Sequence, residues 1–209
     1  DFWADPDTQT VPTKWAAYTK AELITAVGTF TTATLNQFKN AGIRVDAIQL
    51  GNEINNGLLF PSGKIDWSSP AEGYDFVCDV LKSGISAAKA VNKNIYTVIH
   101  LANGGSKDEF NDYFAEVESR GVDYDIIGAS YYPYYHGTLE ELQANLDNVS
   151  SKYKKPVIIA EMSYGFTDEA NEFAANTYSS QVEDAGKFLT SIQGQATAIH
   201  DVIEVLSKV

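Results

Sequence analysis

Four short apolar segments recur along the chain, and longer segments with the apolar spacing of amphipathic helices separate them. The apolar segments are residues 46–51, 95–101, 125–130 and 156–161. Strands that are apolar on both faces and separated by helices indicate a parallel sheet with helices packed on it. The alternation therefore predicts an α/β protein, built either as a doubly wound sheet or as a barrel.

Capping signals mark where the helices should begin. Residues 19–22 read Thr-Lys-Ala-Glu, the form of a capping box, and predict a helix from Thr19 to Gly42. Its spaced apolar residues are Leu23, Val27, Phe30 and Phe38. Further helices are expected to begin near Pro70, at Ser106 and at Thr138, and the last should span about residues 193–206.

The charge of the chain limits its partners. The 209 residues contain 15 Lys and Arg against 28 Asp and Glu, for a formal net charge of -13. Nucleic acids and anionic membranes both need basic patches, so neither is an expected partner. No apolar run approaches the ~18 residues of a membrane-spanning helix. The single cysteine, Cys78, lies in an apolar helical pattern and is expected to be a packed thiol.

Two carboxylates follow predicted strands, and ligands of parallel α/β proteins bind at the carboxyl ends of strands. Glu53 follows the first strand, and Glu161 ends the fourth. Such a pair is the minimum machinery for glycoside hydrolysis, because one acid protonates the leaving oxygen while the other attacks the anomeric carbon or activates water. The phosphate-binding patterns GxGxxG and GxxxxGK[ST] do not occur, so a phosphate-handling enzyme is not expected.

Aromatic and polar side chains near the same strand ends are candidates to bind a sugar, since flat rings with polar rims suit pyranose faces. The candidate substrate-binding residues are Asn52, Trp3, His100, Asn103, Tyr131, Tyr132, Tyr135 and His136. Trp3 could instead be an ordinary core residue, and the two histidines could be satisfied polar residues without a ligand. No His or Cys spacing typical of a metal site occurs, so no metal ligand is assigned.

Longer motifs resemble one enzyme family. The segments DFWADPDTQTVPTKW, VDAIQLGNEINNGLLF, HLANGG, IIGASYYPYYHGTLEEL and GQATAIHDVI occur in this order across nearly the whole chain. Together they resemble the arabinogalactan endo-β-1,4-galactosidases, or endo-β-1,4-galactanases, of glycoside hydrolase family 53. The resemblance implies a (β/α)8 TIM barrel and a retaining hydrolase that cleaves β-1,4-galactosidic bonds in type I arabinogalactan or pectic galactan.

The resemblance also implies roles for single residues. It places the acid/base on strand four and the nucleophile on strand seven, which makes them Glu53 and Glu161. Tyr132 could donate a hydrogen bond to the nucleophile, with Tyr131 as the competing residue. No cofactor is required, although a structural calcium ion is possible in the loop of residues 165–190. Its candidate ligands are Asp168, Glu169, Asn171 and Glu172.

The chain departs from the family pattern at two residues and in length. Tyr135 stands where the family usually has a tryptophan, and Met162 replaces a hydroxyl-bearing residue after the nucleophile. Counted against the barrel, residues 1–209 form a single catalytic-domain segment from about strand four to helix seven, preceded by the loop and helix after strand three. Strand eight and most of strands one to three would be absent. We therefore expect an excerpt of a longer galactanase, or a truncated protein that pairs its sheet edges with another copy.

Two alternative functions remain open. Another clan A glycosidase, a β-mannanase or β-glucanase, would share Asn52, Glu53 and Glu161. A non-catalytic sugar-binding fragment is suggested by the absent strands. In each case the expected partner is a polysaccharide, which implies secretion, while the sequence predicts no oligomeric state.

Overall fold

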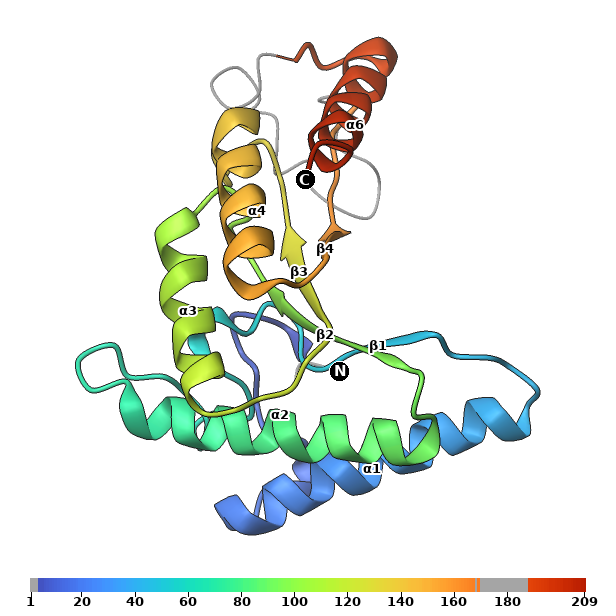
Figure 1. Cartoon of the computed structure of the whole chain (residues 1–209), viewed down its shortest axis with the longest axis vertical. Helices are drawn as coiled ribbons and strands as arrows, with labels where there is room; N and C mark the ends of the chain where they lie inside the picture. The colour runs from blue at the N-terminus through green and yellow to red at the C-terminus, as the bar shows by residue number, and fades with distance from the viewer. Residues whose placement is uncertain (1–3, 168, 170–187) are drawn as a thin grey trace. The chain divides into compact units, whose positions relative to one another are not determined.

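The computed structural model describes residues 4–167, 169 and 188–209, in which helices and strands alternate (Figure 1). The strands are β1 (Ala47–Gln49), β2 (Tyr96–Leu101), β3 (Ile126–Ser130) and β4 (Val157–Glu161). The α-helices are α1 (Lys20–Asn40), α2 (Ala71–Val91), α3 (Lys107–Ser119), α4 (Leu139–Tyr153) and α6 (Ile192–Leu206). Two short 3-10 helices are η2 (Thr13–Trp15) and η3 (Ile54–Asn56). Each strand lies within its predicted segment.

The strands form a 4-stranded sheet in the order β1-β2-β3-β4. β1 and β2 run parallel, with Ala47 opposite Tyr96 and Gln49 opposite Val98. The inner strands β2 and β3 are largely buried, as the apolar pattern predicts. The same prediction is wrong for the outer strands β1 and β4, which are partly exposed because an edge strand has a neighbour on one side alone.

The helices begin at the predicted capping residues. The Thr19 hydroxyl accepts a hydrogen bond from the Glu22 N–H at 3.3 Å, and the Glu22 carboxylate accepts one from the Thr19 N–H at 2.7 Å. Thr138 and Glu141 form the same reciprocal pair at the start of α4. These capping boxes satisfy N–H groups that a helix start leaves without a partner.

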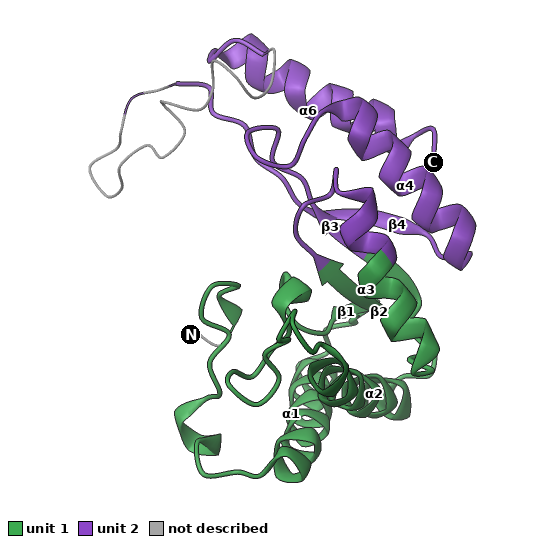
Figure 2. Ribbon diagram, turned by 90° about the vertical axis from the view of Figure 1, so that its left-hand side faces the viewer, with its two compact units in different colours: residues 1–100, 112–127 green, residues 101–111, 128–209 purple. Residues whose placement is uncertain are grey.

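Two compact units make up the chain (Figure 2). Unit 1 comprises residues 1–100 and 112–127, and unit 2 comprises residues 101–111 and 128–209. In unit 1, α1 lies beside α2, and the buried rings of Tyr74 and Tyr113 meet edge to face at 5.5 Å. Cys78 of α2 is fully buried, and burial raises the pKa of its thiol to about 11. The expectation of a packed thiol is therefore confirmed.

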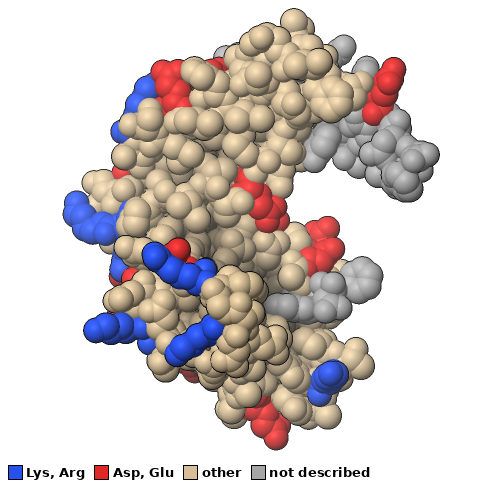
Figure 3. All heavy atoms as spheres, turned by 90° about the vertical axis from the view of Figure 1, so that its right-hand side faces the viewer, with Lys and Arg blue, Asp and Glu red and all other residues tan. Residues whose placement is uncertain are grey.

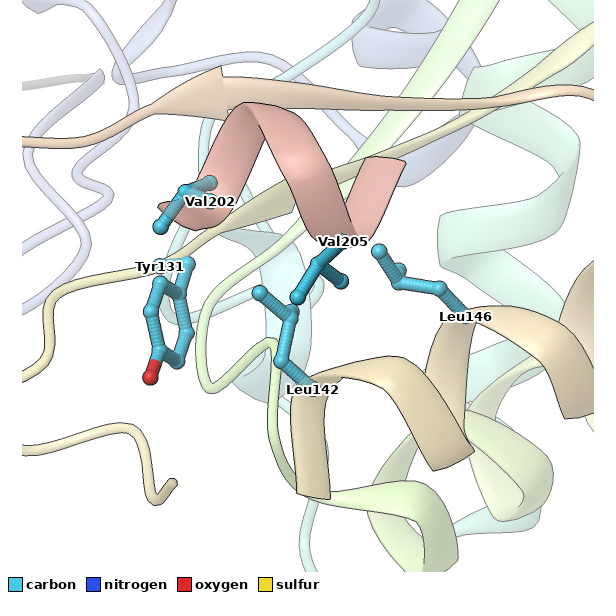
Figure 4. Close-up of a cluster of buried hydrophobic side chains, with 5 residues drawn as sticks. All are labelled: Tyr131, Leu142, Leu146, Val202 and Val205. Atoms are coloured by element: carbon cyan, nitrogen blue, oxygen red, sulfur yellow. The ribbon is translucent and has the colours of Figure 1, made fainter. Parts of the chain in front are cut away.

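The core of unit 2 lies between α4, α6 and the end of β3. Figure 4 shows the ring of Tyr131 beside Val202 of α6, with side chains of α4 facing the same space. The cluster consists of Tyr131, Leu142, Leu146, Val202 and Val205. Because each of these side chains is almost completely removed from water, the cluster holds the segment after β3 against two helices.

The apolar pattern of α1 is only partly buried. Leu23 is 1% exposed, whereas Phe30 and Phe38 are 49% and 41% exposed.

Within the described part of the chain, no helix is long and apolar enough to cross a membrane.

Candidate active site

Glu53 lies on a tight turn at the carboxyl end of β1. It caps η3 with φ 47° and ψ 55°, a left-handed conformation that is uncommon for a residue with a side chain. The turn also requires Gly51, since a Cβ there would lie 2.5 Å from Cγ2 of Ile54. Ile54 and Asn55 follow and are buried, so they anchor the turn while Glu53 stays partly exposed. The local fold thus presents this carboxyl at a strand end in a constrained backbone.

Asn52 is held by residues from the amino-terminal segment of unit 1. Its Nδ2 donates to the carbonyl oxygen of Ala4 at 3.1 Å, and its own carbonyl oxygen accepts from Nε2 of Gln9 at 2.6 Å. Gln9 is 1% exposed, so this bond is shielded from water. Ala4 and Gln9 therefore hold Asn52 at the strand end. The candidate residue Trp3 lies outside the described residues.

Glu161 has a defined hydrogen-bond partner in unit 2. The hydroxyl of Tyr132 donates to Oε2 of Glu161 at 2.9 Å, and the N–H of Tyr131 donates to the backbone oxygen of Glu161 at the same distance. The backbone bond joins the ends of β3 and β4, and the phenol then orients the carboxylate.

The position of Tyr131 does not fit the expectation that it contacts a substrate. It is 1% exposed, and its hydroxyl donates to the carbonyl oxygen of Gly137 at 2.9 Å. Burial raises the pKa of this phenol well above its usual range. Adjacent residues of an extended chain point to opposite sides, so Tyr131 packs into the core while Tyr132 reaches Glu161.

His136 and Tyr135 lie on the loop between β3 and α4. The N–H of Tyr132 donates to Nδ1 of His136 at 3.1 Å, and the Ser130 carbonyl oxygen lies 3.1 Å from the same nitrogen. Burial lowers the pKa of His136, outweighing the Ser130 carbonyl and the Glu109 carboxylate, which raise it. The imidazole of His136 therefore holds the backbone of Tyr132 in place through this hydrogen bond. Tyr135 is 49% exposed and its ring is open to solvent.

His100 lies within β2, and Asn103 follows the end of that strand. His100 is fully buried, so its placement disagrees with the expected sugar contact. Asn103 is partly exposed with φ 59°, and its Nδ2 donates to Oε2 of Glu109 at 2.9 Å. Its side chain is thus committed to a residue of α3.

The stacked pair Tyr134 and Tyr164 was not predicted. Their ring centroids lie 4.9 Å apart with a 12° interplanar angle, and the Gly165 N–H donates to the Tyr134 hydroxyl at 2.6 Å. This contact fixes the chain after β4 against the loop after β3. Gln9 was missed as well, because no sequence motif marks a residue that acts through a distant backbone carbonyl.

A metal site is not assigned. The calcium candidates Asp168, Asn171 and Glu172 lie outside the described residues, and Glu169 is exposed. On α6, ligand atoms of His200, Asp201 and Glu204 lie within 4.8 Å of one another. Glu204 pairs with Lys208 at 2.8 Å, however, and the group sits on a single helix at the surface. Exposed acidic groups of this kind are an ordinary feature of helix surfaces.

The two catalytic candidates belong to different units, Glu53 to unit 1 and Glu161 to unit 2. Each carboxyl is placed at the carboxyl end of a sheet strand by its own unit. In unit 2, the phenol of Tyr132 orients the carboxylate of Glu161. In unit 1, Glu53 presents a partly buried carboxyl on a constrained turn.

Comparison with known proteins places this geometry in a family context. The family model "Glycosyl hydrolase family 53" matches residues 1–209. The endo-beta-1,4-galactanase of Bacillus subtilis (strain 168) is 34% identical over 211 residues, which cover 99% of this chain and 46% of the relative. The probable arabinogalactan endo-beta-1,4-galactanase A of Aspergillus tubingensis is 32% identical over 219 residues, covering 100% of this chain and 57% of the relative. The chain thus spans about half the length of these curated relatives.

Solved structures agree with this comparison. The structure described as "Ignisphaera aggregans GH53 catalytic domain" matches with a TM-score of 0.91 at 36% identity, over 100% of this chain and 56% of the other. A fungal beta-1,4-galactanase structure matches with a TM-score of 0.83 at 30% identity, over 99% and 61% respectively. These likenesses confirm the predicted partial (β/α)8 TIM barrel. Because the family model spans every residue, the chain belongs to glycosyl hydrolase family 53.

Proposed function

We propose that the protein is a retaining endo-β-1,4-galactanase acting on type I arabinogalactan or pectic galactan. The observation that carries the proposal is the 2.9 Å hydrogen bond from Tyr132 to Glu161, which orients a carboxylate at a strand end as a nucleophile requires. The names of the curated relatives, which describe galactanases, support the choice of substrate.

In the proposed mechanism, Glu161 attacks the anomeric carbon while Glu53 donates a proton to the leaving glycosidic oxygen. The bond from carbon to the leaving oxygen breaks as the bond to Glu161 forms. Glu53, now ionised, then takes a proton from water, and the resulting nucleophile displaces Glu161. Two displacements at the same carbon restore the original configuration, so the first product is the β-anomer.

Tyr132 would hold the carboxylate of Glu161 in position for attack. Asn52, fixed by Ala4 and Gln9, would contact the sugar hydroxyls next to Glu53. Exposed Tyr135 offers an apolar face to the polymer, in the place of the larger ring usual in the family. His136 would act through Tyr132 without contact with the sugar being cleaved.

A neutral polysaccharide also suits the surface. On the face drawn in Figure 3, uncharged side chains make up most of the surface. With a formal net charge of -13, the chain favours a neutral polymer over an acidic one. Because galactan is a polymer outside cells, the proposal includes secretion of the protein.

The test is the release of reducing ends from potato galactan, with β-1,4-mannan and β-glucan as competing substrates. We expect galactan to be cleaved in preference, and NMR of the first product to show the β-anomer. Faster cleavage of mannan or glucan would make the protein a different clan A glycosidase. Binding of galactan without hydrolysis would instead support the sugar-binding alternative.

A further inference from the structure

Trp67 lies on the segment between β1 and α2, the same segment that carries Glu53. It is 54% exposed. An indole has a large apolar surface, and leaving it in water forgoes the stabilisation that burial would give. The exposure of Trp67 therefore has two candidate explanations. Either the side chain is not held in place at the surface, or the exposed ring has a function.

The indole is held in place, so a loose position does not explain it. Its Nε1–H donates to Oδ1 of Asn56 at 2.9 Å. Its ring also meets the buried ring of Tyr74 edge to face, with centroids 6.4 Å apart and an interplanar angle of 82°. A polar partner and a core contact together fix both the position and the tilt of the ring.

The support for Trp67 is joined to the turn at Glu53. Asn56 is the last residue of η3, which Glu53 caps, and its carbonyl oxygen accepts a hydrogen bond from the N–H of Ile65 at 2.9 Å. Next to Trp67, Oδ1 of Asp66 accepts from the N–H and the hydroxyl of Ser68 at 2.9 and 2.7 Å. Along η3, Glu53 and Asn56 are separated by about 6 Å. All of these residues belong to unit 1.

We propose that Trp67, positioned by Asn56, is a stacking platform for a galactosyl residue of the substrate, distinct from the residue being cleaved. The inference rests on the proposed function. A fixed, exposed indole whose N–H is already satisfied presents an apolar face, and the apolar face of a pyranose is its complement. Asn56 follows Glu53 within the same 3-10 turn, so the platform is joined to the turn that carries the proposed acid/base, and a neighbouring sugar of the same polymer is its proposed ligand.

The test compares galactan binding among variants in a Glu161→Gln background, so that hydrolysis does not remove the ligand. Retardation of the protein by galactan in native gels measures binding. Trp67→Ala should weaken binding about tenfold, and Trp67→Phe should retain part of it. Asn56→Ala keeps the indole but removes its acceptor, so its effect should be intermediate.

Tyr96 offers a matched control. It is 55% exposed, lies in unit 1 and is the first residue of β2, opposite Ala47 at the start of β1. Tyr96→Ala therefore removes a similarly exposed ring at the other end of the strands, and galactan binding should not change. In the protein with Glu161 intact, Trp67→Ala should raise KM for galactan about tenfold with little change in kcat.

Unchanged binding by Trp67→Ala would overturn the proposal, and so would an equal loss in Tyr96→Ala. A loss of binding that follows a loss of thermal stability across the variants, Trp67→Phe included, would mean that the ring is structural and would also overturn the proposal. If the unmodified protein bound galactan without cleaving it, the proposed function would fail, while weaker binding by Trp67→Ala would still support the platform.

Discussion

The hydroxyl of Tyr132 orients the carboxylate of the proposed nucleophile, Glu161. It donates to Oε2 of Glu161 at 2.9 Å, whereas the hydroxyl of its neighbour Tyr131 donates to a backbone carbonyl in the core. Two chemically identical side chains, adjacent in sequence, thus have separate tasks. The sequence left the choice between them open, because the direction of each side chain depends on the backbone after β3.

Tyr132→Phe tests this assignment. Removing a hydrogen bond to a charged group costs about 1.5–3 kcal/mol, so galactan hydrolysis should fall by roughly 10- to 100-fold in kcat. The loss should be in kcat because the phenol orients the attacking carboxylate. Tyr131→Phe is the control and should lose stability while keeping most of its kcat, since its hydroxyl donates to a backbone carbonyl in the core. An equal loss of kcat in both variants would contradict the assignment.

At the scale of elements, the sequence predicted the helices and strands well because their signals are local. The capping boxes at Thr19 and Thr138 depend on a residue three positions further along the chain, and both form as expected. Burial of whole elements was less predictable. Phe30 and Phe38 follow a helical spacing, yet both rings are largely exposed, since burial requires a partner that the spacing does not specify.

Asp125 joins α2 and β2 to the residue that precedes β3. It precedes β3, and its Oδ2 accepts from Nζ of Lys89 in α2 at 2.6 Å and from the N–H and hydroxyl of Thr97 in β2 at 2.8 and 2.9 Å. Burial alone would raise the pKa of Asp125, but these donors together lower it below the usual value of an aspartate. The ionised carboxylate is therefore the form that stabilises the fold.

Asp125→Asn should lower the free energy of unfolding at pH 7 by about 1–2 kcal/mol, allowing for partial solvent screening. Because the folded pKa is depressed, the contribution is present above about pH 4 and is lost as pH falls through the folded pKa. The gap in melting temperature between variant and wild type should therefore narrow below pH 4. A gap that stays constant down to pH 2 would contradict this account. Arg44–Asp46 is an exposed ion pair, and Asp46→Asn serves as the control with little expected effect.

At the scale of the whole molecule, the proposed reaction requires Glu53 of unit 1 and Glu161 of unit 2 to act on one sugar. A retaining mechanism predicts that their carboxyl groups lie about 5–5.5 Å apart when the site is assembled. A crystal structure of the protein with a bound galacto-oligosaccharide would measure this distance. A separation near 9 Å would instead indicate inversion, and carboxyls at opposite ends of the sheet would contradict the glycosidase mechanism.

The alternation of strands and helices, the capped helix starts and the two carboxylates at strand ends could all be predicted from the sequence. These follow from interactions between residues a few positions apart, or from chemistry that needs particular residue types. The fold was needed to show that Tyr132 and not Tyr131 contacts Glu161, that His100 is buried, and that Asn56 holds Trp67 in an exposed position. A side chain's direction and burial depend on the residues packed around it, and most of those residues are distant in sequence.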